Sequence, residues 1–209
     1  DMAFYGVWDV GKVEWSKKLC DLFEVTPDMF GKPIASGTKV SEIDAKLSAE
    51  TGFAVGTAVV AGAGDQNCGV LGMGGIKGGI ATVTLGTAGL GIISLDKVIP
   101  GVGGLMITNH VIPGMWEAEG LTNAAASSYR WFRDVVGTDE VARADKEGKS
   151  AFDLLNELAA ASKPGANGAL YLPYLATAAT PRWNPNSNGA YIGLTFASAE
   201  QYQVFPPPD

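Results

Sequence analysis

The sequence predicts a protein of the α/β or α+β class. Two observations support this: short β-branched runs alternate with segments of helical length, and several runs are paired across tight turns, as in β-hairpins. The chain has 209 residues, of which 46% are apolar and 18% charged, so it can bury a core in one large or two small domains. The pattern by itself does not choose a topology.

The first expected element is a hairpin. Apolar residues alternate through residues 4–15 on both sides of a turn at Asp9-Val10-Gly11-Lys12, which is the pattern of two short antiparallel strands. Ser16 then offers a side-chain oxygen to cap the helix that follows. Residues 34–43 are expected to be extended.

A second helix and a strand-turn-helix unit come next. Ser41, with Asp44 three residues later, resembles a capping box for a helix that Gly52 closes. Residues 57–61 form an apolar, β-branched run typical of a buried strand, and a helix of small residues is expected over residues 65–75.

The rest of the chain is expected to mix hairpins and helices. Four extended segments are predicted at residues 80–85, 90–95, 105–111 and 115–119. Two helices are predicted at residues 122–135 and 150–162, the second capped by Ser150. Two short strands are predicted at residues 170–174 and 190–194, separated by a loop at residues 180–188.

The composition argues against several classes of protein. A net charge of −7 and a pI near 4.7 disfavour nucleic-acid binding, because neutralising phosphates requires clustered Lys and Arg. Cys20 and Cys68 lack the partners of a zinc site or a disulfide framework. No apolar run reaches the roughly 18 residues of a membrane span, and the first residues lack a signal-peptide pattern. A soluble protein of the reducing cytoplasm is therefore expected.

Familiar nucleotide and hydrolase patterns are also missing. Gly148-Lys149-Ser150 resembles the end of a P-loop, but Arg143 stands where the first glycine is required, and no G-x-G-x-x-G motif follows a strand. His110 is the single histidine, so a Ser-His-Asp triad or a histidine metal site would depend on it alone. A structural role is favoured for His110.

Asp65 is the carboxylate with the strongest pattern for chemistry. It follows a predicted strand and the small residues Gly62-Ala63-Gly64, at the expected start of a helix. One interpretation is a helix N-cap, which Asp favours because its oxygen accepts a backbone N–H. The other is a general base in a cleft that the glycines keep open, with Gln66 beside it to bind a neighbouring hydroxyl.

The turn Leu85-Gly86-Thr87-Ala88-Gly89 is the second candidate. Glycines on both sides of Thr87 would let backbone N–H groups and the threonine hydroxyl point together at phosphate oxygens. By itself, however, the segment is more typical of a glycine-rich hairpin turn.

Two further groups have mainly structural interpretations. Glu117 and Glu119 alternate on a predicted strand and so share a face, which would suit paired carboxylate chemistry of the glycosidase kind, although solvated strand charges are favoured. Tyr129, Trp131 and Phe132 are expected on the buried face of a helix.

Three segments carry a further signal when they are taken together. They are Val59-Val-Ala-Gly-Ala-Gly-Asp-Gln66, Thr82-Val-Thr-Leu-Gly-Thr-Ala-Gly89, and Leu172-Pro-Tyr-Leu175 with Thr180-Pro-Arg-Trp-Asn-Pro-Asn-Ser-Asn-Gly-Ala-Tyr-Ile-Gly-Leu194. In this order and spacing they resemble the FGGY carbohydrate kinases, of the xylulokinase and glycerol kinase kind. The resemblance extends over nearly the whole chain and weakens after Phe196.

The resemblance implies an actin-like, ribonuclease-H-like pair of α/β domains that close over a sugar, ATP and Mg²⁺. By that resemblance, Asp65 matches the catalytic base and Gln66 a residue that contacts the substrate. Gly86 and Thr87 match the turn that contacts phosphate. Ala126 matches a nucleotide-site position where glycerol kinases have glycine, so its methyl group would narrow the approach.

The chain departs from the family pattern in length and in two motifs. The opening D-x-G-T phosphate turn and the later glycine-rich adenosine motif are absent, so we expect incomplete parts of two domains: residues 1–77 from the sugar-side domain and residues 78–209 from the nucleotide-side domain. Little kinase activity is expected from this chain alone, because its phosphate clamp is incomplete. The tail at residues 201–209 departs from the family's helix.

Function beyond this level is left open between three alternatives. The first is a kinase for a small sugar or polyol, with a pentulose such as xylulose favoured as the substrate. The others are a noncatalytic, truncated kinase-like interaction module and, with less support, a glycoside hydrolase that uses Glu117 and Glu119. A fragment that exposes half of a domain interface is also expected to self-associate, for example as a homodimer.

Overall fold

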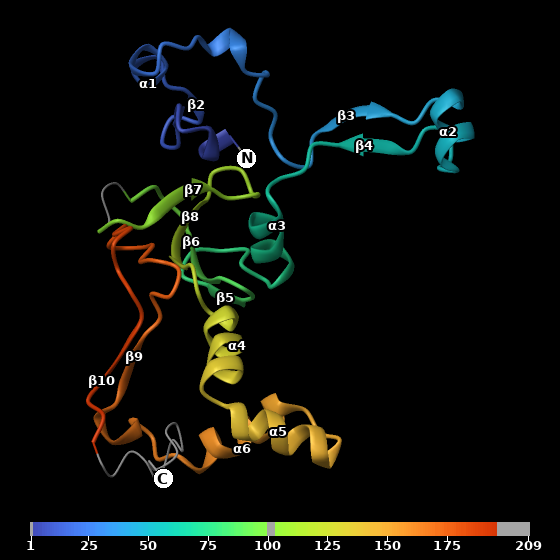
Figure 1. Ribbon diagram of the computed structural model, residues 1–209. Helices are drawn as coiled ribbons and strands as arrows, with labels where there is room; N and C mark the ends of the chain where they lie inside the picture. Colours follow the sequence, from blue (N-terminus) through green and yellow to red (C-terminus); the bar gives the residue numbers. More distant parts are fainter. Residues whose placement is uncertain (1, 100–102, 196–209) are drawn as a thin grey trace. The chain divides into compact units, whose positions relative to one another are not determined.

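The chain folds into two compact units. The computed structural model describes residues 2–99 and 103–195, with the elements labelled in Figure 1. The first unit comprises Asp1–Thr82 with Gly91–Gly120, and the second comprises Val83–Leu90 with Leu121–Asp209. In the described part of the chain, no helix has both the length and the apolar character needed to cross a bilayer.

The elements of the first 80 residues are short. The helical ones are η1 (Met2–Tyr5), α1 (Lys17–Leu22), η2 (Pro27–Met29), α2 (Ala45–Thr51) and α3 (Asp65–Gly72). The strands are β1 (Trp8–Asp9), β2 (Glu14–Trp15), β3 (Lys39–Glu42) and β4 (Ala58–Val60).

The predicted N-terminal hairpin is confirmed in β1 and β2. Trp8 pairs with Trp15 and Asp9 with Glu14, and the Asp9 carboxylate accepts two backbone N–H groups of the turn. The ring of Trp15 stacks on Phe30 at 4.7 Å between centroids and meets Trp8 edge to face at 5.0 Å. Aromatic packing of this kind stabilises a hairpin that is too short to persist alone.

Local capping follows the sequence closely, with one correction. Ser16 caps α1 by accepting the N–H of Leu19 at 3.3 Å, as predicted. The cap of α2 is Asp44, which accepts the N–H of Leu47 at 2.8 Å, rather than the predicted Ser41, which lies in β3. Asp caps as well as Ser, and here the backbone stays extended up to residue 44.

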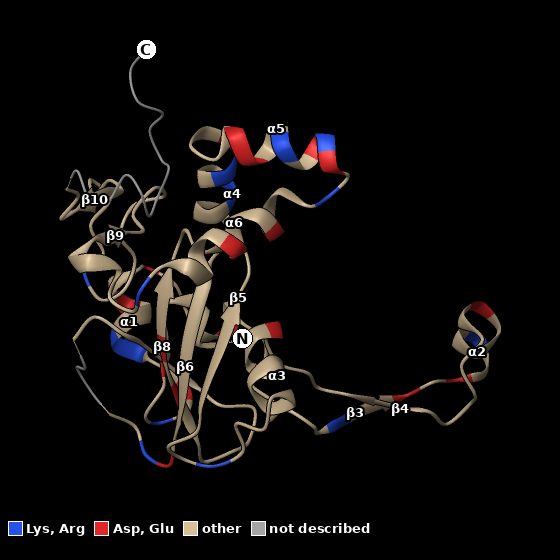
Figure 2. Ribbon diagram, turned by 90° about the horizontal axis from the view of Figure 1, so that it is seen from below, with Lys and Arg blue, Asp and Glu red and all other residues tan. Residues whose placement is uncertain are grey.

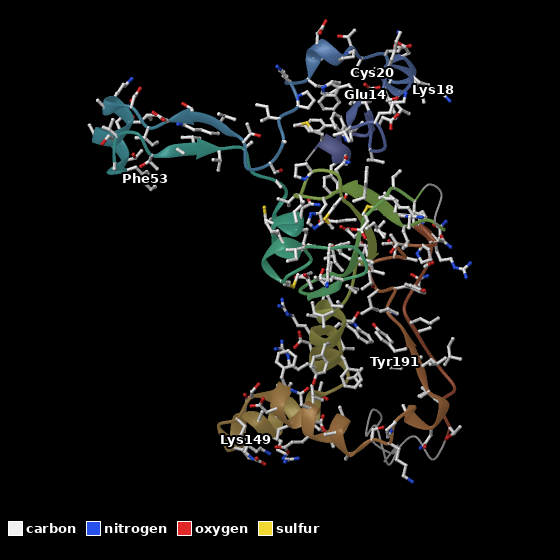
Figure 3. All side chains as sticks on the ribbon, turned by 180° about the vertical axis from the view of Figure 1, so that it is seen from behind. Glu14, Lys18, Cys20, Phe53, Lys149 and Tyr191 are labelled. Carbon is white, nitrogen blue, oxygen red and sulfur yellow. The ribbon has the colours of Figure 1, made fainter. Side chains whose placement is uncertain are left out.

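Strand β4 corrects a second expectation. All three of its residues are exposed, although the β-branched run predicts a buried strand. The reason is that β4 pairs only with β3, in a two-stranded sheet that no other described layer covers. At the α2 end of this hairpin, where Gly52 closes the helix in a left-handed conformation, Phe53 is 60% exposed (Figure 3).

A four-stranded sheet occupies the middle of the sequence. Its strands are β5 (Ala81–Leu85), β6 (Gly89–Leu95), β7 (Met106–Asn109) and β8 (Trp116–Thr122). They are ordered β5-β6-β8-β7, and the division between the two units falls within β5, β6 and β8. The four strands predicted from the sequence are thereby confirmed, with small shifts at their ends.

In its described residues, the second unit adds three α-helices, one helical turn and two short strands. These are α4 (Ala126–Val135), α5 (Thr138–Glu147), α6 (Ala151–Ala161), the single turn η3 (Ala166–Gly168), β9 (Leu170–Leu172) and β10 (Ala190–Ile192). Ser150 caps α6 as predicted, by accepting the N–H of Phe152. The tail predicted at residues 201–209 lies outside the described residues.

Helix α5 is not predicted by the sequence reading. Figure 2 shows Lys, Arg, Asp and Glu interspersed along it, and its N-cap makes no side-chain hydrogen bond. Its acidic residues fall in the first turn and Lys146 in the last, which suits the helix dipole. It packs against α6 and buries Glu140 and Ala144, so its buried stripe consists of one acidic and one small side chain.

Candidate functional site

Asp65 opens helix α3 and presents a carboxylate oxygen without a partner. Its side chain is exposed, and Oδ1 accepts the N–H of Gln66 at 2.8 Å. Among the described residues, Oδ2 has no hydrogen-bond partner. A carboxylate held by one oxygen at a helix N-terminus, with the other oxygen open, can accept a proton from an alcohol.

The position of Asp65 corrects the capping interpretation. The N-cap of α3 is Gly64, which makes no side-chain hydrogen bond, and Asp65 is the first residue inside the helix. The helix begins one residue earlier than a cap at Asp65 would require, because Gly64, at φ −58° and ψ 147°, already occupies the non-helical N-cap position. Helix α3 also ends at Gly72, three residues before the predicted limit. Gln66 is half-buried beside Asp65.

The second candidate segment, in the second unit, joins a hairpin turn to the start of α4. Ala125 N–H donates to the Thr87 carbonyl at 3.0 Å and Ala126 N–H donates to the Gly86 carbonyl at 2.9 Å. The Ser127 hydroxyl donates to the Thr87 carbonyl at 2.9 Å. The structure therefore brings together three of the predicted site residues: Gly86, Thr87 and Ala126.

These contacts determine which groups of the turn remain open. The Thr87 side chain is exposed, and within the described residues its hydroxyl has no partner. In contrast, the N–H of Ala126 is used by the turn itself. A ligand at this turn would contact the hydroxyl of Thr87 and the exposed methyl group of Ala126. It would not find the free backbone N–H groups that the first turn of a helix usually offers, because the turn already uses the N–H of Ala126.

Gly89 allows the turn to approach α4 this closely. A Cβ atom at Gly89 would lie 3.0 Å from both Ala125 Cβ and Thr122 Cγ2, closer than ordinary van der Waals contact. The second glycine of the predicted motif is thus explained by packing.

The third motif is anchored to the same region of the second unit. The Thr180 hydroxyl exchanges hydrogen bonds with Leu121, accepting from its N–H and donating to its carbonyl at 3.1 Å. Asn123 Nδ2 donates to the Ala176 carbonyl at 2.9 Å. Leu121 and Asn123 lie outside the three motifs, so the sequence does not predict these contacts.

The two glutamates of β8 correct another expectation. Glu117 and Glu119 do share a face of the strand, but they are buried, 1% and 6% exposed, and not solvated. Burial raises the pKa of both carboxyls above the usual range, and the charge of Glu117 raises that of Glu119 further. Carboxylates sealed in this way cannot reach a glycosidic bond, so the structure gives no support to the glycosidase alternative.

His110 has the structural role that the sequence favours. It is buried, its Nδ1 accepts the N–H of Ile112 at 2.9 Å, and its Nε2 lies 2.7 Å from the Gly75 carbonyl. Because Nδ1 is an acceptor, Nε2 carries the hydrogen and donates it to Gly75. His110 is thus a buried hydrogen-bonded residue and not an open metal ligand.

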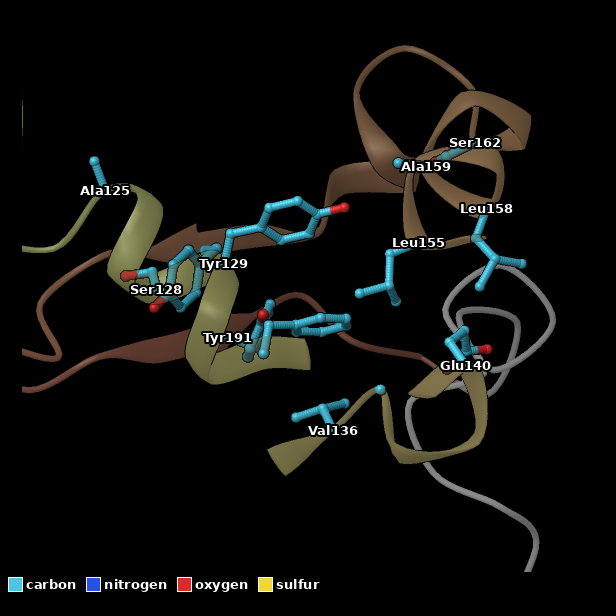
Figure 4. Close-up of a pocket in the computed structure, with 13 residues that line it drawn as sticks. Ala125, Ser128, Tyr129, Val136, Glu140, Leu155, Leu158, Ala159, Ser162 and Tyr191 are labelled. Atoms are coloured by element: carbon cyan, nitrogen blue, oxygen red, sulfur yellow. The ribbon is translucent and has the colours of Figure 1, made fainter. Parts of the chain in front are cut away.

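An apolar pocket in the second unit was not predicted. Its volume is about 350 Å³, and it lies between α4, α5, α6 and the β9–β10 strands. Figure 4 shows Tyr129, Val136, Leu155 and Tyr191 around it. Tyr129 is 37% exposed and, with Phe132, lines this pocket rather than a closed core. Helical periodicity shows that such residues share one face of the helix, but it does not show whether other side chains pack against that face.

Comparison with known proteins agrees with this arrangement of motifs. The model of the N-terminal domain of the FGGY family of carbohydrate kinases matches residues 2–72, and the model of its C-terminal domain matches residues 81–203. The chain is 29% identical to the gluconokinase of Bacillus licheniformis over 95% of its own length and 39% of that protein. It is 32% identical to the xylulose kinase of Staphylococcus epidermidis, over 87% of the chain and 35% of that protein.

A solved structure gives the same picture. The xylulose kinase of Rhodospirillum rubrum superimposes with a TM-score of 0.78 at 23% identity, over 94% of this chain and 38% of that one. The chain therefore belongs to the FGGY family of carbohydrate kinases and contains parts of both family domains, with the actin-like fold. The family and fold predicted from the three motifs are confirmed. The chain spans less than half the length of these relatives.

Proposed function

We propose that this chain is part of an ATP-dependent kinase that transfers the γ-phosphoryl group of ATP to a hydroxyl of a small sugar or polyol. The observation that carries the proposal is Asp65, whose open Oδ2 lies at the N-terminus of α3 within the segment that matches the N-terminal family domain. In this role Asp65 takes the proton of the attacking hydroxyl, which makes the oxygen a better nucleophile. Gln66 binds a neighbouring hydroxyl.

The second unit supplies the phosphate side in this proposal. Gly86 and Thr87 hold phosphate oxygens, and the exposed Ala126 borders the nucleotide site. Mg²⁺ bound to ATP would neutralise charge on the phosphates. The residues present fit this role although they include few carboxylates, because Mg²⁺ on nucleotides is held largely by phosphates and water. Within the described residues, no group of three His, Cys, Asp or Glu could hold a metal. Residues 1–77 complete the sugar-side domain and residues 78–209 begin the nucleotide-side domain.

The favoured substrate is a pentulose such as xylulose, and gluconate is the main competitor. The relatives named above include a gluconokinase and a xylulose kinase with similar identity to this chain. Their names therefore support a sugar or a sugar acid as the substrate class and do not choose between xylulose and gluconate. A cytoplasmic location follows from the need for ATP. Exposed large apolar side chains such as Leu22, Phe53 and Leu85 support self-association of this chain, for which a homodimer is the simplest form.

The test is ATP turnover by the full-length protein that contains this chain, measured against xylulose, gluconate, glycerol and other polyols, beside the 209-residue chain. Turnover in the full-length protein and little in the chain is expected. Asp65→Asn is isosteric and should abolish turnover while the thermal unfolding midpoint is kept. Turnover that survives Asp65→Asn would contradict the role of Asp65, and silence with every acceptor would favour a noncatalytic interaction module.

A further inference from the structure

A buried hydrogen bond ties helix α3 to strand β8. Asn67 Nδ2 donates to Glu117 Oε2 at 2.7 Å, and the two residues are 5% and 1% exposed. They are fifty positions apart in the sequence, but both belong to the first unit. A hydrogen bond to a carboxylate is about twice as strong as one between neutral groups, so it is a strong constraint on the first turn of α3.

The other end of α3 is held as well. Gly75, three residues beyond the helix, accepts from His110 Nε2 at 2.7 Å and from the Ser94 hydroxyl at 3.1 Å. The His110 ring also lies 3.5 Å from Glu117 Oε1. A Cβ at Gly75 would lie 2.5 Å from Val70 Cγ1, so this segment fits tightly under α3.

Helix α3 has little else to fix its first turn. It is eight residues long, and of these only Asn67 and Val70 are buried. Its N-cap, Gly64, provides no side-chain hydrogen bond, and isolated helices shorter than about 12 residues are marginal in water. The orientation of the first turn therefore depends on the bond between Asn67 and Glu117.

Asp65 lies in that same first turn. Asp65 and Asn67 are two residues apart, which is about 200° around a helix, so the exposed carboxylate and the anchored amide lie on opposite sides of the turn. A rotation or shift of the amide would move the carboxylate by a similar amount. A misplacement of about 1 Å can cost roughly 100-fold in rate.

We infer that Asn67 and Glu117 are positioning residues, which fix the first turn of α3 and thereby the direction of the Asp65 carboxylate. The inference rests on the proposed role of Asp65 as general base. Asn67 Oδ1 and Glu117 Oε1 are buried and make no hydrogen bond to the described residues, so the bond from Asn67 Nδ2 to Glu117 Oε2 carries the connection between these two side chains. Loss of one partner leaves the other unsatisfied and frees the turn.

The experiment uses the full-length protein and separates the effect of the bond from that of the charge. Glu117→Ala should lower kcat about 10-fold to 100-fold and change KM for ATP and sugar less than about 3-fold. The kcat of Glu117→Gln should stay within about 3-fold of the parent, because a Gln carbonyl still accepts from Asn67.

The kcat of Asn67→Asp should fall, because two carboxylates then repel each other. Asn67→Asp combined with Glu117→Gln should recover kcat, since the amide of Gln then donates to the carboxylate of Asp.

Glu119→Gln is the matched control. Glu119 is a buried carboxylate on the same face of β8 but makes no hydrogen bond to α3 in the described residues, so its loss should leave kcat unchanged. If Glu117→Ala and Asn67→Asp leave kcat within about 2-fold, or if the double variant does not recover, the inference is wrong. If Asp65→Asn abolishes turnover but Glu117→Ala leaves kcat unchanged, this inference alone is overturned. If the full-length protein has no kinase activity, the proposed function and the inference are both overturned.

The 209-residue chain offers a second measurement that needs no activity. Cys68 is exposed on α3 and Cys20 is buried, so a thiol-reactive spin label attaches selectively next to Asn67. Its electron spin resonance spectrum should show greater mobility in Glu117→Ala and parent-like mobility in Glu117→Gln and Glu119→Gln. An unchanged spectrum in Glu117→Ala would contradict the anchoring of the helix itself.

Discussion

Asn109 hydrogen-bonds Trp8 across 101 positions of sequence. The indole Nε1 of Trp8 donates to Asn109 Oδ1 at 2.8 Å, and Asn109 Nδ2 donates to the Val10 carbonyl at 2.9 Å. The same carbonyl accepts from Trp116 Nε1 at 2.7 Å. One amide side chain therefore satisfies a donor and an acceptor of the N-terminal hairpin and joins it to β7.

Asn109→Ala should destabilise the first unit by about 2 kcal/mol, because it leaves the Trp8 indole N–H buried without a partner. The free energy of unfolding from urea titration, followed by tryptophan fluorescence, measures this. Lys12→Ala in the same hairpin is the control: its ion pairs with Asp9 and Glu14 are exposed and long, at 3.9 and 3.8 Å, so its loss should change little. Equal effects of the two substitutions would show that the Asn109 bonds contribute nothing specific.

Gly89→Ala should destabilise the second unit by about 1–3 kcal/mol, because the new methyl group would overlap Ala125 and Thr122 and separate the turn from α4. Gly91→Ala is a matched control two residues along the same strand, where a Cβ meets nothing within 4 Å. Thermal unfolding of the two variants makes the comparison. Similar losses in both would mean that strand propensity, and not the approach of Ala125, accounts for the glycine.

Local signals explain why much of the fold could be predicted. Ser16 and Ser150 act as caps through hydrogen bonds to residues two or three positions away, and the N-terminal hairpin closes within eight residues. Helix α5 was missed because its buried stripe consists of small and acidic side chains, and hydrophobic periodicity records neither. Strand β4 was predicted as buried because propensity describes a residue's fit to a sheet, and not what covers the sheet.

The candidate site shows the same limit. Asp65, Gly86 and Thr87 are marked by short motifs, so the sequence alone nominates them. The bond between Asn67 and Glu117 could not be predicted, because it joins residues fifty positions apart, and an isolated glutamate on a strand is more often solvated than buried. One signal could have suggested the burial of Glu117. Glu117 and Glu119 share one face of a strand, so packing of that face against the rest of the unit would bury both carboxylates together.

Thr87→Ala in the full-length protein should lower kcat/KM for ATP about 10-fold to 100-fold, because it removes a hydroxyl that is free to bind phosphate. Thr87→Ser keeps the hydroxyl and should retain most activity. The turn itself should survive both changes, since Thr87 contacts Ala125 and Ser127 through its backbone carbonyl. Steady-state kinetics at varied ATP make the measurement, and a Thr87→Ala enzyme equal to its parent would remove Thr87 from the phosphate site.

Glu117 should make the 209-residue chain less stable as the pH rises. Burial raises the pKa of its carboxyl above 4.5, although the hydrogen bond from Asn67 opposes the change. The folded state therefore binds the proton more tightly than the unfolded state. This contribution to stability is complete below the unfolded-state pKa and is lost as the pH rises through the folded-state pKa.

Glu117→Gln should remove that dependence, since an amide does not titrate. The variant should gain stability relative to the parent as the pH rises above the unfolded-state pKa, because the parent carboxyl loses its proton in a buried site. Urea unfolding across this range measures the difference. Glu119, whose pKa is raised in the same direction, still titrates in the variant, so the slope should diminish without vanishing. An unchanged slope in Glu117→Gln would show that Glu117 is ionised as easily in the folded chain as in the unfolded one, and that burial at this position does not penalise the charge.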